Sequence, residues 1–191
     1  MRRLSTLAVV VLAAAVAAGC GRDRLYPADF EFKAADRTES ASYPDVGMRF
    51  RYPIGVGLAS SPAPGIFRGA AGDAFLSGFA YRRAEQLPRN RRELAAARRR
   101  LVTATRDRSP SYRLRSARTT RVDGAPAVEL LGDQRLSNGN LRTRSLHVYK
   151  GRAEYVLELA ADARDFARLD REVYRPIRQS LELTGKVRRR G

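Results

Sequence analysis

The chain has 191 residues, of which 43% are hydrophobic, so it has room for one domain with a genuine core. Its 37 lysine and arginine residues, set against 20 acidic residues, give a formal net charge of +17. The single histidine excludes a multi-histidine metal site, and the single cysteine excludes an internal disulfide. We therefore expect a basic globular domain that holds no metal and no cofactor.

The N-terminal residues have the pattern of an export signal. Met1-Arg2-Arg3 is a short cationic start, and residues 7–18 form an apolar run of 12 that leads into the small residues before Cys20. This order of cationic, apolar and small residues is typical of a secretory signal. A membrane-spanning helix needs about 20 apolar residues. Residues 1–19 are therefore predicted to be a signal peptide and not a permanent anchor.

The end of this segment, Ala17-Ala18-Gly19-Cys20, resembles the lipobox of bacterial lipoproteins. In that family a diacylglyceryl group is attached to the cysteine thiol, and the signal is cut just before the cysteine. The resemblance implies that Cys20 is the lipid attachment site and that the mature protein is held on the extracytoplasmic side of the cell membrane. The alternative is an ordinary cleavage site, at which Cys20 is an incidental small residue.

Residues 20–44 are expected to be the lipidated cysteine and a flexible tether, because the stretch has mixed charges and few apolar residues. Its aromatic residues, Phe32 among them, could dock part of it onto the domain. Residues 45–185 hold 27 basic and 15 acidic side chains, and residues 186–191 add a basic tail. The excess charge has two interpretations that the sequence leaves open: adsorption to an anionic lipid or envelope polymer, or the arginine-rich codon usage of a GC-rich genome.

The first half of the domain combines short strands with one helix. Alternating apolar residues predict strands at 48–53 and 56–60, and a strand at 75–81 whose two faces are both apolar, as in the interior of a sheet. A helix is predicted after Asn90, because Asn90 and Glu93 form a capping-box pattern. Its apolar residues share one face, so the opposite face, which is rich in arginine, is expected to be solvated.

The sequence pattern of the second half of the domain predicts an antiparallel meander. Four strands are expected, at 112–121, 127–135, 141–149 and 152–160. Asp123-Gly124 and Asn138-Gly139 lie between them and suit hairpin turns with positive φ. In the last strand Tyr155 is expected to face the core, and Glu154 and Glu158 are expected to face solvent.

A final helix is predicted from Asp162 toward Ser180, and Pro176 is expected to bend or restart its last turn. Its apolar residues cluster within about 80° of arc at 100° per residue. Five arginines share the opposite side: Arg164, Arg168, Arg171, Arg175 and Arg178. We interpret them as a candidate surface for an anionic lipid, an envelope polymer or a partner protein. The alternative is a solvated helix face with local ion pairs.

The order of these patterns resembles the PsbP-like superfamily over about residues 45–185. The resemblance rests on Phe50-Arg51-Tyr52-Pro53 at a strand end, on Val-Asp-Gly-Ala-Pro-Ala-Val at residues 122–128, and on a closing helix that ends in Ile-Arg-Gln-Ser-Leu at residues 177–181. It implies an α+β fold in which an antiparallel sheet of about six or seven strands carries helices on both faces, an α/β/α sandwich. Because this superfamily includes the photosystem extrinsic subunit and many actinobacterial lipoproteins, it also implies binding or assembly roles at membranes.

Candidate catalytic groups are few. His147 shares a strand face with Ser145 and Tyr149, which could line a polar cleft, although a strand histidine with a cross-strand partner shows the same pattern. Two carboxylate pairs, Glu129 with Asp133 and Glu154 with Glu158, would form an acidic patch if their strands were neighbours. Ion pairing with the nearby arginines is the structural alternative, and these arginines are Arg142, Arg144 and Arg152.

These patterns favour a lipid-anchored extracytoplasmic module that binds an anionic envelope component or a partner protein and is not an enzyme. The chain has no phosphate-binding loop and no module that reads nucleic acid, so no nucleic-acid partner is expected. Two alternatives stay open. One is an envelope hydrolase with His147 or an acidic pair in a cleft; the other is a carrier with an apolar pocket between sheet and helix.

Overall fold

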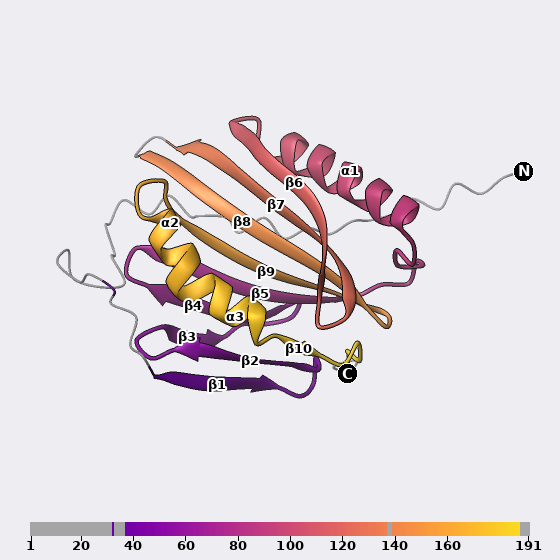
Figure 1. The fold of residues 1–191 in the computed structure, drawn as a ribbon, viewed down its shortest axis with the longest axis horizontal. Helices are drawn as coiled ribbons and strands as arrows, with labels where there is room; N and C mark the ends of the chain where they lie inside the picture. Colours follow the sequence, from indigo (N-terminus) through magenta and orange to yellow (C-terminus); the bar gives the residue numbers. More distant parts are fainter. Residues whose placement is uncertain (1–31, 33–36, 137–138, 188–191) are drawn as a thin grey trace, which may run out of the picture.

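The structure, a computed structural model, describes Phe32, residues 37–136 and residues 139–187. The predicted signal peptide, Cys20 and the end of the basic tail lie outside these residues, so the corresponding expectations stay predictions. Within the described part of the chain, no helix is both long enough and apolar enough to cross a membrane. Figure 1 shows a large twisted sheet, helices packed against it and a smaller sheet at its lower edge.

The large sheet has seven antiparallel strands in the order β3-β4-β5-β9-β8-β7-β6. Their bounds are β3 Gly57–Ser60, β4 Gly65–Ala71, β5 Ala74–Arg82, β6 Tyr112–Val122, β7 Ala125–Leu136, β8 Gly139–Lys150 and β9 Ala153–Asp162. The predicted meander is confirmed, because β6 to β9 pair with their neighbours in antiparallel register. Positive φ angles at Asp123 (47°) and Gly124 (71°) close the turn between β6 and β7.

Strand β5 lies inside the sheet, between β4 and β9, as the sequence predicts. Only one of its faces is fully buried: Leu76 is 2% exposed, whereas Phe75 on the other face is 57% exposed. The cause is the position of helix α1 (Arg91–Arg108), which packs against β6 and β7 at the far side of the sheet. The interior position of β5 is therefore as predicted, and its face with Phe75 is left exposed.

A smaller sheet has the order β1-β2-β10, with β1 Thr38–Tyr43, β2 Met48–Pro53 and β10 Glu182–Leu183. β1 pairs with β2 along its whole length. Residues 38–43 fall in the stretch expected to be tether, so the folded unit begins earlier than residue 45. The sequence TESASY shows no apolar alternation, and the strand forms because β2 offers it backbone hydrogen bonds.

Helix α1 begins with the predicted capping box. The side chain of Asn90 accepts a hydrogen bond from the amide of Glu93 at 2.9 Å, and the carboxylate of Glu93 accepts one from the amide of Arg89 at 2.7 Å. These bonds satisfy amides that have no partner inside the helix. The predicted start of α1 is therefore confirmed.

The C-terminal helix begins at Phe166, later than predicted, and has three parts: α2 Phe166–Leu169, the π-helical turn η1 Asp170–Tyr174, and α3 Arg175–Gln179. Asp162 does not cap it, because its carboxylate instead accepts a hydrogen bond from the amide of Arg164 at 2.9 Å. Pro176 lies in the first turn of α3, where a proline is tolerated. The helix therefore restarts at Pro176, as predicted.

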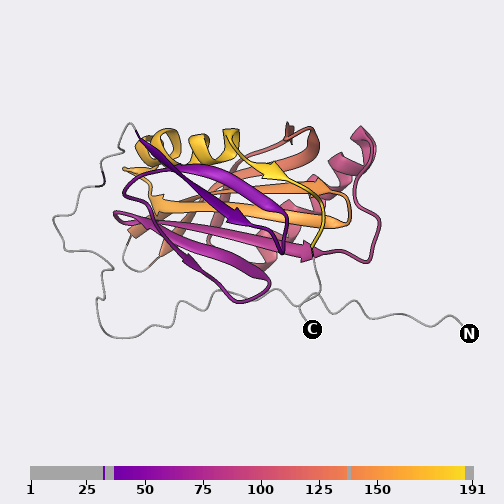
Figure 2. The ribbon, with the colours of Figure 1, turned by 90° about the horizontal axis from the view of Figure 1, so that it is seen from below.

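Two apolar clusters are formed by side chains that point in opposite directions from the large sheet. This is possible because successive strand residues point to opposite faces. On β8, Leu146 joins the larger cluster, which contains Phe166 of the C-terminal helix, whereas Tyr149 joins the smaller cluster, which contains Leu94 of α1. Figure 2 shows the C-terminal helix running along one side of the strands. Both clusters and every strand pair lie within Phe32–Val187, so a chain that begins at Gly21 keeps all the contacts described here.

Candidate functional site

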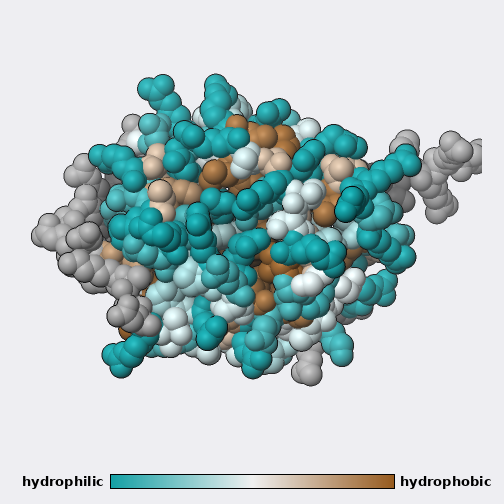
Figure 3. All heavy atoms as spheres, viewed as in Figure 1, coloured by the Kyte–Doolittle hydropathy of each residue, from teal (hydrophilic) through white to brown (hydrophobic). Residues whose placement is uncertain are grey.

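The five arginines predicted to form a docking stripe on the C-terminal helix all lie against carboxylates. Arg164 pairs with Asp162, Arg168 and Arg171 pair with Glu172, Arg175 pairs with Asp170, and Arg178 pairs with Glu129. Figure 3 shows hydrophilic side chains over most of this face of the molecule, with apolar groups between them. Each positive charge on this helix is therefore accompanied by a negative one.

Arg178 also departs from the predicted outward direction. Its side chain is 25% exposed, and its Nε lies 3.3 Å from Oε2 of Glu129 on the sheet. Arg168 likewise turns toward the domain, since its Nη1 donates a hydrogen bond of 2.8 Å to the carbonyl of Phe32. The structure thus brings these two arginines into the fold, and the stripe is not continuous on the outer surface.

Under the C-terminal helix lies a set of ionic groups that we call the buried charge network: Glu129 on β7, Arg144 on β8 and Asp170 on η1. Nη1 of Arg144 lies 2.7 Å from Oε1 of Glu129, and its Nε lies 2.7 Å from Oδ1 of Asp170. The side chains of Glu129 and Asp170 are 3% and 4% exposed. Breaking such a pair leaves a buried charge uncompensated. The network therefore ties the helix to the sheet.

Aromatic rings enclose this network. The guanidinium of Arg144 lies 5.9 Å from the ring centre of Phe166 and 5.8 Å from that of Tyr174. Burial raises the pKa of Tyr174 well above its ordinary value, and the nearby Glu129 carboxylate adds to this effect. Groups held this way are screened from solvent, which fits a structural role for the arginines that reach them.

The largest group of arginines without ionic partners on one described element lies on α1. The helix contains seven, namely Arg91, Arg92, Arg98, Arg99, Arg100, Arg106 and Arg108. Among the described residues, none of the seven forms an ion pair with a carboxylate. The acidic residues of α1 are only Glu93 and Asp107. This helix therefore carries a net positive charge that the fold does not neutralise.

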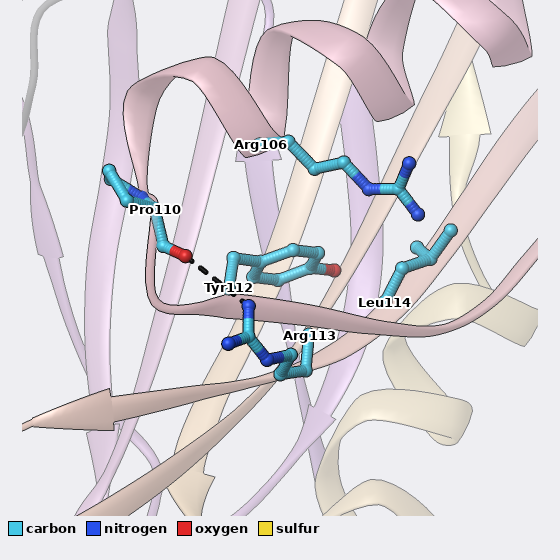
Figure 4. Close-up of a pocket in the computed structure, with 5 residues that line it drawn as sticks. All are labelled: Arg106, Pro110, Tyr112, Arg113 and Leu114. Carbon is cyan, nitrogen blue, oxygen red and sulfur yellow. Dashed lines mark hydrogen bonds between the residues drawn. The ribbon is translucent and has the colours of Figure 1, made fainter.

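A pocket of about 360 Å³ opens where α1 leads into β6. Arg106, Tyr112 and Arg113 line it together with Pro110 and Leu114. Figure 4 shows the Arg106 side chain extending from α1 past the Tyr112 ring, while Nη1 of Arg113 donates a hydrogen bond of 3.4 Å to the carbonyl of Pro110. The lining is cationic and aromatic, which suits an oxyanion. It differs from the apolar cavity between sheet and helix that a lipid carrier needs.

On the α1 side of the sheet, His147 lies beside a carboxylate. Its Nδ1 is 2.8 Å from Oε1 of Glu154, whose Oε2 accepts a hydrogen bond of 2.7 Å from Nε of Arg83. Glu154 is 4% exposed, so the expectation that it faces solvent is wrong. Its neighbours across the strands are Tyr81 and Tyr149, which cover it.

The two carboxyl groups of β9 differ in acidity. Burial opposes the ionisation of Glu154, but the hydrogen bond and charge of His147, with the charge of Arg83, outweigh it and lower the pKa of Glu154. Burial raises the pKa of Glu158, and the charges of His147 and Arg108 only partly offset this. Carboxyl groups with diverging pKa values beside a histidine are the kind of arrangement that acid–base catalysis uses.

The acidic patch considered from the sequence does not form. β8 separates β7 from β9, and Glu129 reaches the C-terminal helix whereas Glu154 lies on the α1 side. The expected ion pairing is found for Arg144 with Glu129 and for Arg142 with Asp133 at 2.6 Å, and the Arg142 hydrogen bond lowers the pKa of Asp133. Arg152, the third expected partner, has no ion pair within the described chain.

Sequence reasoning missed Arg83 as a partner of His147 and Glu154, and it missed the pocket formed by Arg106 and Arg113. The Arg83 contact comes from strand register, so no local spacing signals it, whereas the pocket is lined by residues close in sequence, from Arg106 to Leu114, at the α1–β6 connection. The structure offers no group of three histidine, cysteine, aspartate or glutamate residues that could hold a metal ion within the described segments.

No protein-family model matches the chain, and no curated protein matches it. Several solved structures share its fold. Cyanobacterial PsbP (CyanoP) from Synechocystis sp. PCC 6803 aligns with a TM-score of 0.60 at 12% identity, over 86% of this chain and 97% of CyanoP.

Two further structures show the same likeness. LpqN of Mycobacterium tuberculosis, described as involved in cell envelope biogenesis, aligns with a TM-score of 0.55 at 12% identity, over 78% of this chain and 91% of LpqN. The Ran-binding protein Mog1p of Saccharomyces cerevisiae aligns with a TM-score of 0.54 at 9% identity, over 80% of this chain and 96% of Mog1p. The chain therefore has a mixed α+β, PsbP-like fold built on a seven-stranded antiparallel sheet, and it shares this fold with a mycobacterial protein involved in cell envelope biogenesis.

Proposed function

We propose that the protein is an extracytoplasmic accessory module, anchored to the cell membrane through a lipid on Cys20, that binds an anionic component of the envelope without catalysing a reaction. The predicted signal peptide, the tether and the sandwich arrangement with a helix on each face belong to this proposal. In this arrangement the lipid on Cys20 holds the domain next to the membrane, in the same compartment as its ligand.

The observation that carries the proposal is the unbalanced positive charge of α1, which the fold leaves without ionic partners among its described residues. An arginine that stabilised the domain would be expected beside a carboxylate, as on the C-terminal helix. Arginines left unpaired on one exposed helix are available to an external anion. The shared fold with a mycobacterial protein involved in cell envelope biogenesis and the lipobox-like residues before Cys20 support the location.

The anchor is tested by the intact mass of the protein purified from membranes of a bacterial host that processes lipoproteins. We expect a chain that begins at Cys20 and carries a diacylglyceryl group on it. The Cys20→Ser variant removes the thiol and should lose both the acyl mass and the cut at that position. An unprocessed leader, or a bare thiol on the mature wild-type chain, would contradict the proposal.

A second candidate function, hydrolysis, is favoured by one observation, the contact of His147 with Glu154 near the differently titrating Glu158. Its test is turnover of ester and glycoside substrates by the wild-type chain and by the His147→Ala variant. The accessory-module proposal predicts no rate that depends on His147. A reproducible rate that disappears in the variant would favour the hydrolase instead.

A further inference from the structure

The outer surface of α1 carries a straight row of arginines. Arg92, Arg99 and Arg106 recur every seven residues, which is nearly two helical turns, so they lie on one line about 10.5 Å apart. All three are exposed, and the line lies opposite the buried Leu94 and Ala97. We call these three residues the α1 crest. The crest spans about 21 Å along the helix.

The crest is unpaired because it points away from the sheet and because neither acidic residue of α1, Glu93 or Asp107, forms an ion pair with it in the described structure. α1 packs on β6 and β7, and the carboxylates of β7, Glu129 and Asp133, point to the other face of the sheet. There they meet Arg144 and Arg142. The strand residues that face α1 are apolar, among them Val128. The α1 side of these strands therefore presents apolar residues, and not carboxylates, to the helix.

The crest ends in the cationic pocket. Arg106 belongs to both, and Arg113 adds a second guanidinium whose only described hydrogen bond goes to the Pro110 carbonyl. Two guanidinium groups on either side of the Tyr112 ring could hold the oxygens of a phosphate group. The pocket thus offers a defined position for one headgroup at the end of a row of more diffuse charges.

We propose that the α1 crest and the adjoining pocket dock the domain onto an anionic phospholipid bilayer, with a lipid phosphate held between Arg106 and Arg113. This inference rests on the proposed function and names its surface and its ligand. A lipid surface supplies many negative charges over a flat area, and each basic residue close to it contributes about 1 kcal/mol. Screening limits the attraction to about 8 Å at physiological salt, a distance that exposed crest arginines can reach.

The surface between the crest arginines favours a bilayer over a protein partner. Ala96 and Thr103 lie on one flank of the crest, and Val102 on the other flank is partly buried against the core, so no fully exposed large apolar side chain lies between the crest arginines. Protein interfaces depend on buried aromatic and apolar anchors. A row of arginines separated by small residues has no such anchor, but it suits contact with a continuous sheet of phosphates.

The distance from the anchor permits this contact. Only residues 21–31 separate Cys20 from the buried Phe32, and this stretch can extend to at most about 40 Å. A domain of this size is itself about 40 Å across. The lipid would therefore hold the domain close enough to the bilayer for α1 to turn onto it.

The test is sedimentation of the chain of residues 21–191 with phosphatidylcholine vesicles that contain or lack phosphatidylglycerol, at about 0.15 M salt. This chain lacks Cys20, so no acyl group contributes. We expect binding only to the vesicles with phosphatidylglycerol. The variant Arg92→Glu, Arg99→Glu, Arg106→Glu should lose at least about tenfold in partition, since three favourable charges become repulsive.

A matched control reverses three exposed arginines elsewhere: Arg37, Arg51 on β2 and Arg68 on β4, each replaced by Glu. None of these three arginines forms an ion pair in the described structure, and replacing them with Glu changes the net charge by the same amount as the crest variant does. The control should lose no more than about threefold, because distant exposed charges are screened. Urea unfolding of both variants shows that they are folded.

The outcomes separate this inference from the function on which it rests. If the crest variant and the control lose vesicle binding equally, the attraction depends on net charge alone and the inference is overturned. If the crest variant binds as well as the wild type, the binding surface lies elsewhere and the inference is also overturned. In both cases the proposed binding of an anionic component is unaffected. Displacement by inorganic phosphate at the concentration of lipid phosphate would identify a small-anion site and would overturn the bilayer assignment. The bilayer assignment would also be overturned if the wild-type chain did not bind phosphatidylglycerol vesicles but bound a protein or a soluble anionic polymer. Failure of the Cys20 mass test would overturn the proposed anchor alone.

Discussion

The two helical regions of this domain use arginine in opposite ways. The C-terminal helix has four arginines, each of which lies beside a carboxylate, and two of them reach into the fold. α1 has seven arginines, and among the described residues none forms an ion pair. Arginine thus stabilises the fold in one helix and is left available as charge in the other.

The difference has two sources: Asp170 and Glu172 on the C-terminal helix pair with its own arginines, and the sheet supplies a further carboxylate. Pleating sends Glu129 toward the C-terminal helix, where Arg144 and Asp170 complete the buried charge network. The strands under α1 present apolar residues instead, and they hold the helix by packing. An arginine-rich helix face therefore identifies a docking surface only when neither the helix itself nor the strands beneath it bring carboxylates to its arginines.

The largest effect is expected from Arg144→Met, which removes the centre of the buried charge network. Glu129 and Asp170 would both lose their closest buried cation, and breaking a buried pair costs about 3–5 kcal/mol. Urea unfolding measures this change. A loss below about 1 kcal/mol would show that the network does not hold the C-terminal helix, and the contrast between the two helices would fail.

An intermediate effect is expected at Glu158, a carboxyl group on the α1 side that no described arginine pairs with. Its pKa is raised from 4.5 by burial, so the wild-type fold is favoured below that value and loses stability as the pH rises through the raised pKa. A tenfold change in an acid dissociation constant corresponds to about 1.4 kcal/mol. The Glu158→Gln variant should lack this loss and be more stable than the wild type at neutral pH.

Unfolding curves from pH 4 upward check this expectation. Glu182→Gln, which removes an exposed carboxylate beside Arg49, provides the comparison, and it should change the free energy of unfolding by no more than about 1 kcal/mol. Parallel profiles for the wild type and Glu158→Gln would mean that burial does not perturb Glu158.

The smallest effect is expected from neutralising the crest, with Arg92, Arg99 and Arg106 each replaced by Gln. These side chains are exposed and have no ionic partner in the described chain, so the free energy of unfolding should change by no more than about 0.5 kcal/mol. Thermal and urea unfolding provide the measurement. A loss of several kcal/mol would give these arginines a structural role and would remove the basis for assigning them to binding.

Much of the fold follows from local chemistry. The hairpin turn at Asp123-Gly124, the capping box of Asn90 and Glu93 and the restart of the helix at Pro176 are all readable from residue type and spacing. β1 is not readable, because its polar sequence carries no alternation and its partner is supplied by β2. The outward face of β9 was misjudged, because alternation does not show what covers a face of a sheet.

The candidate site was harder to predict than the fold. Four of the five predicted arginines lie on the C-terminal helix and Arg164 lies before it, and spacing along one helix does not show that Glu129, distant in sequence, reaches Arg178. The contact of Arg83 with Glu154 likewise depends on the pairing of β5 with β9. The charge pattern predicts where arginines lie along a helix, but it does not show which distant carboxylates they contact.

The central claim, that α1 and not the C-terminal helix meets the membrane, is tested most directly by a fluorescent probe on each helix. Residues 21–191 contain no cysteine, so Thr103→Cys beside the crest and Ala167→Cys on α2 each give one labelling site, and both positions are exposed. With phosphatidylglycerol vesicles that carry a headgroup quencher, we expect strong quenching of the probe at position 103 and little quenching of the probe at position 167. Stronger quenching at position 167 would contradict the central claim.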